Sequence, residues 1–348
     1  MNQGKKRSAL DIISNYQGDP VRIMEVCGTH THEIFRLGIR NILPDSIELI
    51  SGPGCPVCVT EVEFIDEAVM LALDKGCCIC TFGDLIRVPG SNMSLADARA
   101  KGAFIKPVYT PQDALDYAIS NPDIDVVFLA VGFETTTPSA ALSVDLAAQK
   151  GVKNYSILTA NKTMPSAYRA LKGSADAYLF PGHVNAISGA NSSKELVDEG
   201  ISGVICGFTD KEILTAIAYT LVKLQEGKPF FKNCYPRVVT DEGSIPARKL
   251  VDKVMEKCDA SWRGLGVIND SGMKLRDEYI EYDARRKYNL PKITGKTNPA
   301  CRCGEVLQGK CKPNECPLYK KVCTPQSPVG ACMVSNEGTC AAYYTYSV

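Results

Sequence analysis

The 348-residue sequence lacks an excess of either charge, since Lys and Arg together number 39 and Asp and Glu also number 39. A neutral chain has no general attraction to nucleic acid or to an anionic membrane, so neither is expected as a partner. Long apolar runs are missing too: the longest, around residues 125–133, is strand-sized and far below the roughly 18–20 residues of a membrane span. Residues 1–13 are basic without a following apolar core, which argues against a signal peptide. We therefore expect a cytoplasmic protein.

Histidine is scarce, with three residues, whereas cysteine is abundant, with sixteen. Nine cysteines lie in the first 300 residues and seven in the last 48. Stable structural disulfides are rare in a reducing compartment, so this many cysteines indicate metal binding, redox chemistry or simple burial. The dense C-terminal segment is the candidate for cross-linking by a metal.

Short apolar runs alternate with amphipathic segments between about residues 20 and 230. Such alternation predicts an α/β fold in which parallel sheets carry helices on both faces. A helix is expected over 62–75, closed by Gly76. Strands are expected at 21–26, 47–50, 78–82, 104–108, 126–131, 156–159, 177–180 and 204–206.

Three structural units are predicted. Pro122 and a break near residues 123–125 divide the α/β region into a domain over 20–125 and a second over 126–235. Residues 236–348, with 1–19 as an optional addition, form a third unit. It begins with a helix near 245–258 and ends in a loop-rich tail of Cys, Pro and Gly.

Unusual loops follow four of the predicted strands: CGTHTH at 27–32, GPGCPVC at 52–58, GFETTTP at 132–138 and PGH at 181–183. Open parallel sheets bind their ligands at the carboxyl ends of the strands. All three histidines fall in these loops, and none is expected in the core of a helix or strand. The co-location predicts one functional site built from the four loops.

Cys55 and Cys58 have the spacing of a reversible disulfide or of half a metal site. Thr60 and Glu63 predict a capping box that places both sulfurs before a helix N-terminus, where the helix dipole would lower the thiol pKa. Two small buried residues in a stiff turn are the alternative. Zinc is less favoured, because no second Cys-x-x-Cys completes a standard site.

Cys27 has the chemistry of a soft thiolate ligand for iron or copper(I), with His30 or His32 tuning or protonating it. Alternatively, a threonine of this loop caps a short helix and the histidines are incidental. Glu134 lies in a loop that superficially resembles a phosphate loop but lacks the Lys and the glycine spacing of a Walker motif. We expect Glu134 to act as a local acid or base, or to organise the cysteine loops.

The tail contains a series of four cysteines, Cys303-x12-Cys316-x6-Cys323-x16-Cys340, in an irregular segment without histidine. This composition favours a [4Fe–4S] cluster over zinc, whose ribbons use paired Cys-x-x-Cys knuckles. Spacing alone leaves open which four of the seven tail cysteines bind. Elsewhere, simple burial is expected for Cys77, Cys78, Cys80, Cys206 and Cys234.

Taken together, CGTH at 27–30, the loop at 52–58, GFETT at 132–136 and the tail over 301–340 resemble the HypD family of [NiFe]-hydrogenase maturation factors. The resemblance extends over about residues 22–344. It implies two α/β domains and a cluster-binding third domain. It also implies partnership with the small chaperone HypC and transient contact with HypE, the donor of cyanide ligands. The resemblance further implies that the complex assembles an Fe(CN)2CO unit, which is then delivered to the hydrogenase large subunit.

The resemblance also implies roles for individual residues. Cys27 would hold the iron together with a cysteine of HypC, and Cys55 and Cys58 would be the redox-active pair. His30 and Glu134 match family motif positions and are expected to be catalytic. The implied cluster ligands, with Cys332 close enough to compete, are Cys303, Cys316, Cys323 and Cys340.

The expected function is that of a redox-active assembly scaffold, and whether it turns over as an enzyme is left open. A freestanding iron–sulfur thiol–disulfide oxidoreductase is the main alternative, although it leaves Cys27 and the histidines without a role. A zinc-stabilised binding protein without redox activity is a third possibility.

Overall fold

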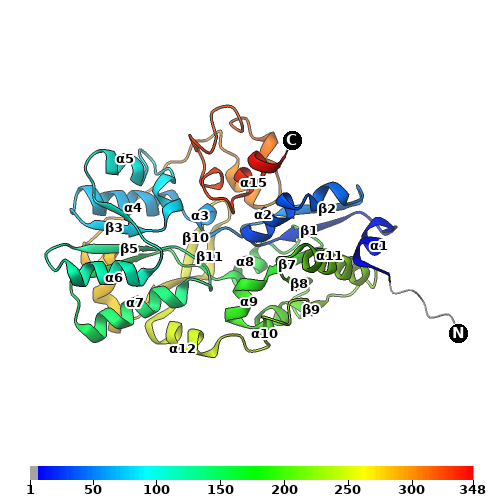
Figure 1. The fold of residues 1–348 in the computed structure, drawn as a ribbon, viewed down its shortest axis with the longest axis horizontal. Coiled ribbons are helices and arrows are strands. Elements are labelled where there is room, and N and C mark those ends of the chain that lie inside the picture. The colour runs from blue at the N-terminus through cyan, green and yellow to red at the C-terminus, as the bar shows by residue number, and fades with distance from the viewer. Residues whose placement is uncertain (1–6, 348) are drawn as a thin grey trace.

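Two parallel sheets lie side by side, and the cysteine-rich tail sits over their junction (Figure 1). The structure, a computed structural model, describes residues 7–347. The first sheet has the order β2 (Ile47–Ser51), β1 (Val21–Glu25), β7 (Ala177–Pro181), β8 (Gly203–Cys206) and β9 (Phe231–Asn233). The second has the order β4 (Ile105–Pro107), β3 (Cys78–Thr81), β5 (Val126–Ala130) and β6 (Tyr155–Thr159). Every predicted strand is present.

Helices cover both faces of each sheet, which confirms the predicted fold class. One face of the first sheet packs against α1 (Ala9–Ser14), α2 (Gly28–Arg36) and α11 (Asp210–Leu224), and the other against α8 (Met164–Ala170), α9 (Gly182–Ser188) and α10 (Ala190–Lys194). The second sheet lies between α4 (Val62–Leu73) with α5 (Leu95–Ala100) and α6 (Pro111–Ser120) with α7 (Thr137–Lys150). No helix among residues 7–347 is long and apolar enough to cross a membrane.

The chain passes from the first sheet to the second and back. It leaves after β2 through residues 52–61, builds β3 to β6, and returns through residues 160–176 to β7. The predicted division between residues 125 and 126 is therefore wrong, because it separates β3 from β5, which pair in one sheet. Hydrophobic periodicity locates strands but does not say which strands pair, and here β1 pairs with the distant β7.

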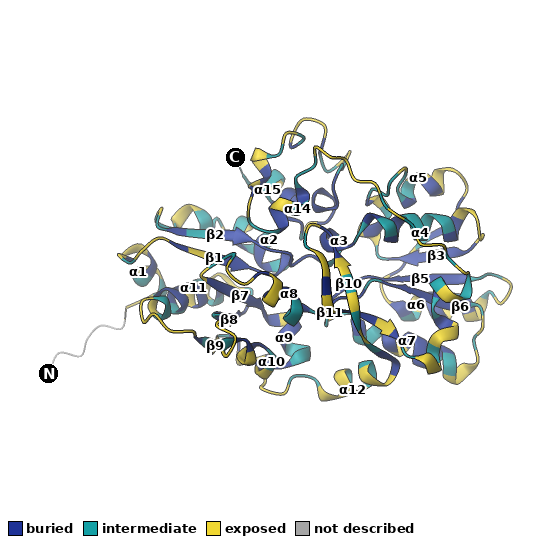
Figure 2. Ribbon diagram, turned by 180° about the vertical axis from the view of Figure 1, so that it is seen from behind, coloured by how far each residue is buried: buried dark blue, intermediate teal, exposed yellow. Residues whose placement is uncertain are grey.

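A β-hairpin lies between the two sheets, and its first four residues fall in the predicted helix (Figure 2). The predicted helix over 245–258 ends early: α12 spans Ile245–Val254 and runs directly into β10 (Met255–Trp262), which pairs with β11 (Gly266–Leu275). In β10 the two end residues, Met255 and Trp262, are buried, while those between are more exposed. The hairpin is held to the returning crossover, since the Met273 amide donates to the Asn161 carbonyl at 3.0 Å.

The tail has little regular structure, as predicted. Its helices are short: α13 (Ala284–Lys287), α14 (Cys303–Leu307), η5 (Pro313–Glu315), η6 (Ala331–Met333) and α15 (Thr339–Tyr346). The last of these packs against α2, and η6 packs against α3 (Pro56–Val59) of the first crossover. The remaining 3-10 helices are η1 (Ile39–Ile42), η2 (Gly83–Arg87), η3 (Glu195–Val197) and η4 (Asp277–Tyr282). The tail thus reaches back to the carboxyl ends of the first strands.

Candidate functional site

The four predicted loops line one cavity of about 480 Å³ between the two sheets, so their predicted co-location is confirmed. The first sheet contributes the loops after β1 and β7, the second contributes the loop after β5, and the crossover contributes the segment before α3. Among the lining residues are Cys27, Gly54, Gly132, Thr136, His183 and Glu337.

Cys27 follows β1 by two residues and occupies the N-cap position of α2, without a capping hydrogen bond from its side chain. The Gly54 loop lies directly against it: the Gly28 amide donates to the Gly54 carbonyl at 3.0 Å. A Cβ atom on Gly54 would come within 2.2 Å of the Cys27 nitrogen, so only glycine permits this approach. Burial, with a smaller effect from the Glu337 charge, raises the pKa of the Cys27 thiol to about 12.

Glu337 is a cavity residue that the sequence analysis did not identify. The Thr29 hydroxyl donates to its Oε1 at 2.7 Å, and a Cβ atom on Gly28 would lie 2.5 Å from the Glu337 Cβ. The tail therefore closes over the loop that carries Cys27. The only signal in the sequence is an acidic residue between two tail cysteines, which does not indicate this contact.

The histidines lie in helices, contrary to the prediction. His30 and His32 are in α2 and His183 is in α9, because each helix starts directly after its strand. His30 is fully buried beside the Gly207 carbonyl, at 2.9 Å from Nε2, and stacks on Phe208. Burial lowers the pKa of His30 to about 4. His183 lines the cavity, whereas His30 is not among its lining residues.

Glu134 lies in the loop after β5, and its side chain binds the returning crossover. Its Oε1 accepts a hydrogen bond from the Met164 amide at 2.9 Å, while Oε2 is buried and has no partner within the described residues. Burial raises the pKa of Glu134 to about 7. Glu134 does not line the cavity, so its position suits the expected organising role better than direct contact with a ligand.

Cys55 and Cys58 lie at the start of the four-residue helix α3, and the Cys58 amide donates to the Cys55 sulfur at 3.2 Å. The predicted capping box is wrong. Thr60 instead donates to the Pro56 carbonyl at 2.8 Å, and α4 begins one residue later with Glu61 as its N-cap. The predicted lowering of the thiol pKa is also absent at Cys58. Burial and the neighbouring thiols of Cys332 and Cys55 raise the pKa of Cys58 well above its ordinary value.

Cys332, in η6, connects the Cys55–Cys58 pair to the tail cysteines. The thiols of Cys303, Cys340 and Cys58 all interact with it, and together they lower the pKa of Cys332 well below its usual value. The neighbouring thiols of Cys301 and Cys332 raise the pKa of Cys303, and the thiol of Cys332 raises the pKa of Cys340. Cys332 thus lies near a cysteine of the crossover and near cysteines of the tail.

Six of the seven tail cysteines line a second, small cavity whose walls are otherwise apolar. All four predicted ligands are among them, together with Cys301 and Cys332. Within residues 7–347, no three His, Cys, Asp or Glu side chains are placed to hold a single metal ion. The six are Cys301, Cys303, Cys316, Cys323, Cys332 and Cys340.

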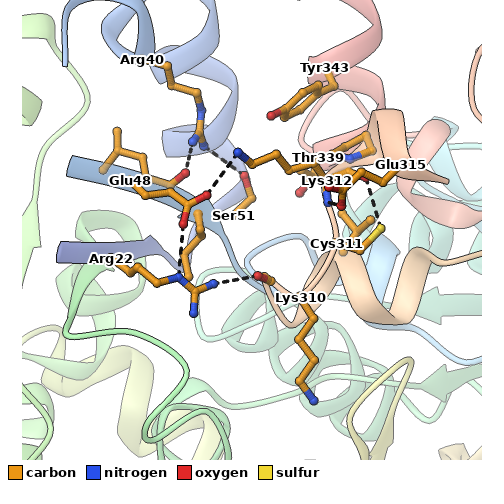
Figure 3. A pocket seen from close by; sticks show the side chains of 15 residues that line it. Arg22, Arg40, Glu48, Ser51, Lys310, Cys311, Lys312, Glu315, Thr339 and Tyr343 are labelled. Carbon is orange, nitrogen blue, oxygen red and sulfur yellow. Dashed lines mark hydrogen bonds and ion pairs between the residues drawn. The ribbon is translucent and has the colours of Figure 1, made fainter. Parts of the chain in front are cut away.

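Cys311 is the tail cysteine that points elsewhere (Figure 3). It lines a polar cavity of about 310 Å³, and its sulfur donates to the Lys312 carbonyl at 3.2 Å. The charges there pair with each other: Glu48 contacts Arg22 at 3.3 Å and Lys312 at 3.2 Å. Of the cysteines expected to be structural, Cys77, Cys78, Cys80 and Cys206 are buried and Cys234 is partly exposed.

Comparison with known proteins shows the family of this chain. The sequence matches the family HypD, described as the hydrogenase formation hypA family, over residues 5–347. It is 40% identical to the hydrogenase maturation factor HypD of Azotobacter vinelandii over 93% of this chain and 89% of the relative. It is also 40% identical to the HypD factors of Escherichia coli K12 and Rhodobacter capsulatus, over 94% of this chain and 89% of each relative.

Proposed function

The chain belongs to the HypD family of hydrogenase maturation factors, and from that premise we propose that it is the cytoplasmic scaffold on which the Fe(CN)2CO unit is assembled. HypC shares the iron, HypE delivers the cyanide ligands, and the hydrogenase large subunit receives the product. The observation that carries the proposal is that, within residues 7–347, Cys27 is the one cysteine lining the cavity where the four loops meet.

Cys27 is suited to hold the iron. Iron that carries cyanide and CO needs a soft, anionic ligand, which a thiolate provides. Because burial keeps the pKa of this thiol near 12, the proton stays on sulfur until a cation arrives, and iron binding releases it. Gly54 and Gly132 present backbone to the cavity, which leaves room for the small ligands and for a cysteine of HypC.

His183 and Glu337 are the ionisable side chains beside Cys27 in this cavity. Burial lowers the pKa of His183, so its ring is neutral near pH 7 and donates one N–H. A cyanide nitrogen is an acceptor that such a donor can hold. Glu337 holds the loop through Thr29 and fixes where the Cys27 sulfur lies.

Cys55 and Cys58 supply electrons beside the iron. Reduction of their disulfide takes two electrons and two protons and yields two thiols, with a one-electron protein reductant as the external donor. A [4Fe–4S] cluster held by four of the six cavity cysteines would provide the one-electron steps. Cys332 lies near cysteines of both sets, so we assign to it the passage of electrons between them.

The donor set suits that cluster. The lining offers six thiols, which are the ligands expected of an iron–sulfur site, and it contains no carboxylate or imidazole. Six thiols are more than the four ligands that one zinc or one cluster needs, so the cavity can supply all four cluster ligands from cysteine alone. Cys311 is unsuitable as a ligand because it faces another cavity.

Anaerobic purification of the chain, alone and with HypC, tests the proposal. Iron and acid-labile sulfide in equal amounts are expected for the chain alone. Additional iron with infrared bands of cyanide and CO is expected only when HypC and the cyanide-delivering protein are also present. A colourless protein that contains zinc and no sulfide would contradict the cluster, and absence of the bands with all partners present would contradict the scaffold.

A freestanding thiol–disulfide oxidoreductase remains the second candidate, because the contact between Cys58 and Cys332 serves that chemistry equally well. The two candidates predict different results for the isolated chain. An oxidoreductase would reduce disulfides without HypC, and a Cys27→Ala variant would reduce them as fast as the wild type.

A further inference from the structure

The turn of the β10–β11 hairpin lies between α3, which carries Cys58, and α14, which begins at Cys303. The Arg263 amide donates to the Val59 carbonyl of α3 at 2.9 Å. On its other side, Gly264 touches the backbone of α14: a Cβ atom on Gly264 would lie 2.4 Å from the Gly304 Cα. Gly264 also has a φ of +84°, which favours glycine. The turn therefore fixes the distance between the Cys55–Cys58 helix and the helix that begins at Cys303.

Arg263 turns its side chain into this junction. The residue is only 8% exposed, and its Nε donates to the Thr60 carbonyl at 2.9 Å. Its Nη2 is buried and has no hydrogen-bond partner within the described residues. Arg263 lines a cavity of about 300 Å³ together with Cys301 and Cys303, which also line the cavity of six thiols. A buried guanidinium with a free N–H group is costly unless a negative charge faces it.

Four thiols of the six-cysteine cavity, ionised on binding the proposed cluster, would supply that negative charge. The geometry places Arg263 next to them, since it lines the same cavity as Cys301 and Cys303. Glu61, the carboxylate in the same cavity, accepts a hydrogen bond from the Ser261 hydroxyl at 2.9 Å and also faces the charge of Arg263. Lys296 also lines the cavity but is exposed, so solvent screens its charge. Arg263 is thus the buried cation of this junction.

We propose that Arg263 is a positioning residue for the tail cofactor: its fixed positive charge raises the reduction potential of a cluster bound by the tail thiolates and holds the cysteine pair of α3 beside it. This rests on the proposed cluster. A four-thiolate cluster is anionic and becomes more so when one electron enters, with no bond made or broken. A cation in a protein interior favours the reduced form, because the low effective dielectric preserves its charge.

Redox titration followed by electron paramagnetic resonance tests this on the full chain, reconstituted anaerobically and reduced with dithionite. Arg263→Met removes the charge at similar volume, and Arg263→Lys keeps it but loses the planar hydrogen bond to Thr60. Lys296→Met is the matched control, since it removes one charge from the same cavity at an exposed position.

At the wild-type midpoint potential, Arg263→Met is expected to lower the ratio of reduced to oxidised cluster about tenfold, which is about 59 mV for one electron. Arg263→Lys and Lys296→Met are expected to stay within twofold of the wild type. An unchanged midpoint in Arg263→Met would overturn the inference. Loss of the cluster in Arg263→Met but not in Arg263→Lys would support it, and loss in both would show a purely structural role. Absence of a cluster from the wild-type chain would instead refute the proposed function.

Discussion

Replacing Gly54 by alanine is expected to push apart the two loops that form the iron site. The new Cβ atom would lie 2.2 Å from the Cys27 nitrogen and 2.3 Å from its Cα, and both are backbone atoms that cannot rotate away. The displacement also weakens the 3.0 Å hydrogen bond from the Gly28 amide to the Gly54 carbonyl. Cys27 would then lose its fixed position against the Cys55 loop.

The size of the effect follows from these two contacts. Overpacking of a tight interior site costs about 1–3 kcal/mol, and loss of one backbone hydrogen bond costs about 0.5–1.5 kcal/mol. We therefore expect a loss of roughly 2–4 kcal/mol in the free energy of unfolding. Gly83→Ala is the matched control: nothing lies within 4 Å of a Cβ atom there, and its φ is not positive.

Urea unfolding measured by fluorescence provides the assay, because Trp262 is the only tryptophan of the chain. It is fully buried near the site, stacks on Phe133 and donates to the Ser271 hydroxyl at 2.8 Å. Gly54→Ala should lower the unfolding midpoint and the iron retained with HypC, while Gly83→Ala changes neither. If Gly54→Ala unfolds within about 0.5 kcal/mol of the wild type, the contact does not position Cys27.

Three further predictions concern single side chains. The pKa of Glu134 is about 7 when folded against an ordinary 4.5, so the folded chain binds more protons between these values; its stability should fall by roughly 3 kcal/mol as pH rises from about 4.5 to 7. Glu134→Gln should remove that part of the pH dependence in urea titrations at pH 5 and pH 8, and an identical dependence in both proteins would show that another group is responsible. Cys323→Ser should abolish acid-labile sulfide while Cys311→Ser retains it, and equal losses would contradict the assignment of Cys311 to a separate cavity. Cys332→Ser should slow reduction of the Cys55–Cys58 disulfide by the external donor, as measured by thiol alkylation; an unchanged rate would exclude Cys332 from the path.

The strands and the site loops were predictable because their signals are local. Apolar runs such as residues 126–131 produce strands wherever a sheet buries both faces, and the carboxyl ends of parallel strands gather at one edge. The division into sheets was not predictable in the same way. β1 pairs with β7 although all strands of the second sheet lie between them in the sequence, and no periodicity in either strand specifies that partner.

Long-range contacts account for the other differences. The sequence near residue 255 continues a helical pattern, but pairing with β11 converts it to strand. Glu337 and Arg263 reach their sites only because the tail and the hairpin fold back over the first crossover, so no local motif marks them. The choice of cluster ligands was limited for the same reason. The sequence offers seven tail cysteines as candidates, and only the folded structure shows that Cys311 lines a different cavity from the other six.

The most direct test of the central claim is an infrared measurement on the chain purified anaerobically with HypC, comparing Cys27→Ala with the wild type. Cys206→Ala is the matched control, because that cysteine is also buried at a strand end but does not line the cavity. Cyanide and CO bands should disappear in Cys27→Ala and persist in Cys206→Ala, while cluster absorbance remains in both. Persistence of the bands in Cys27→Ala would contradict the assignment of Cys27 as the iron ligand.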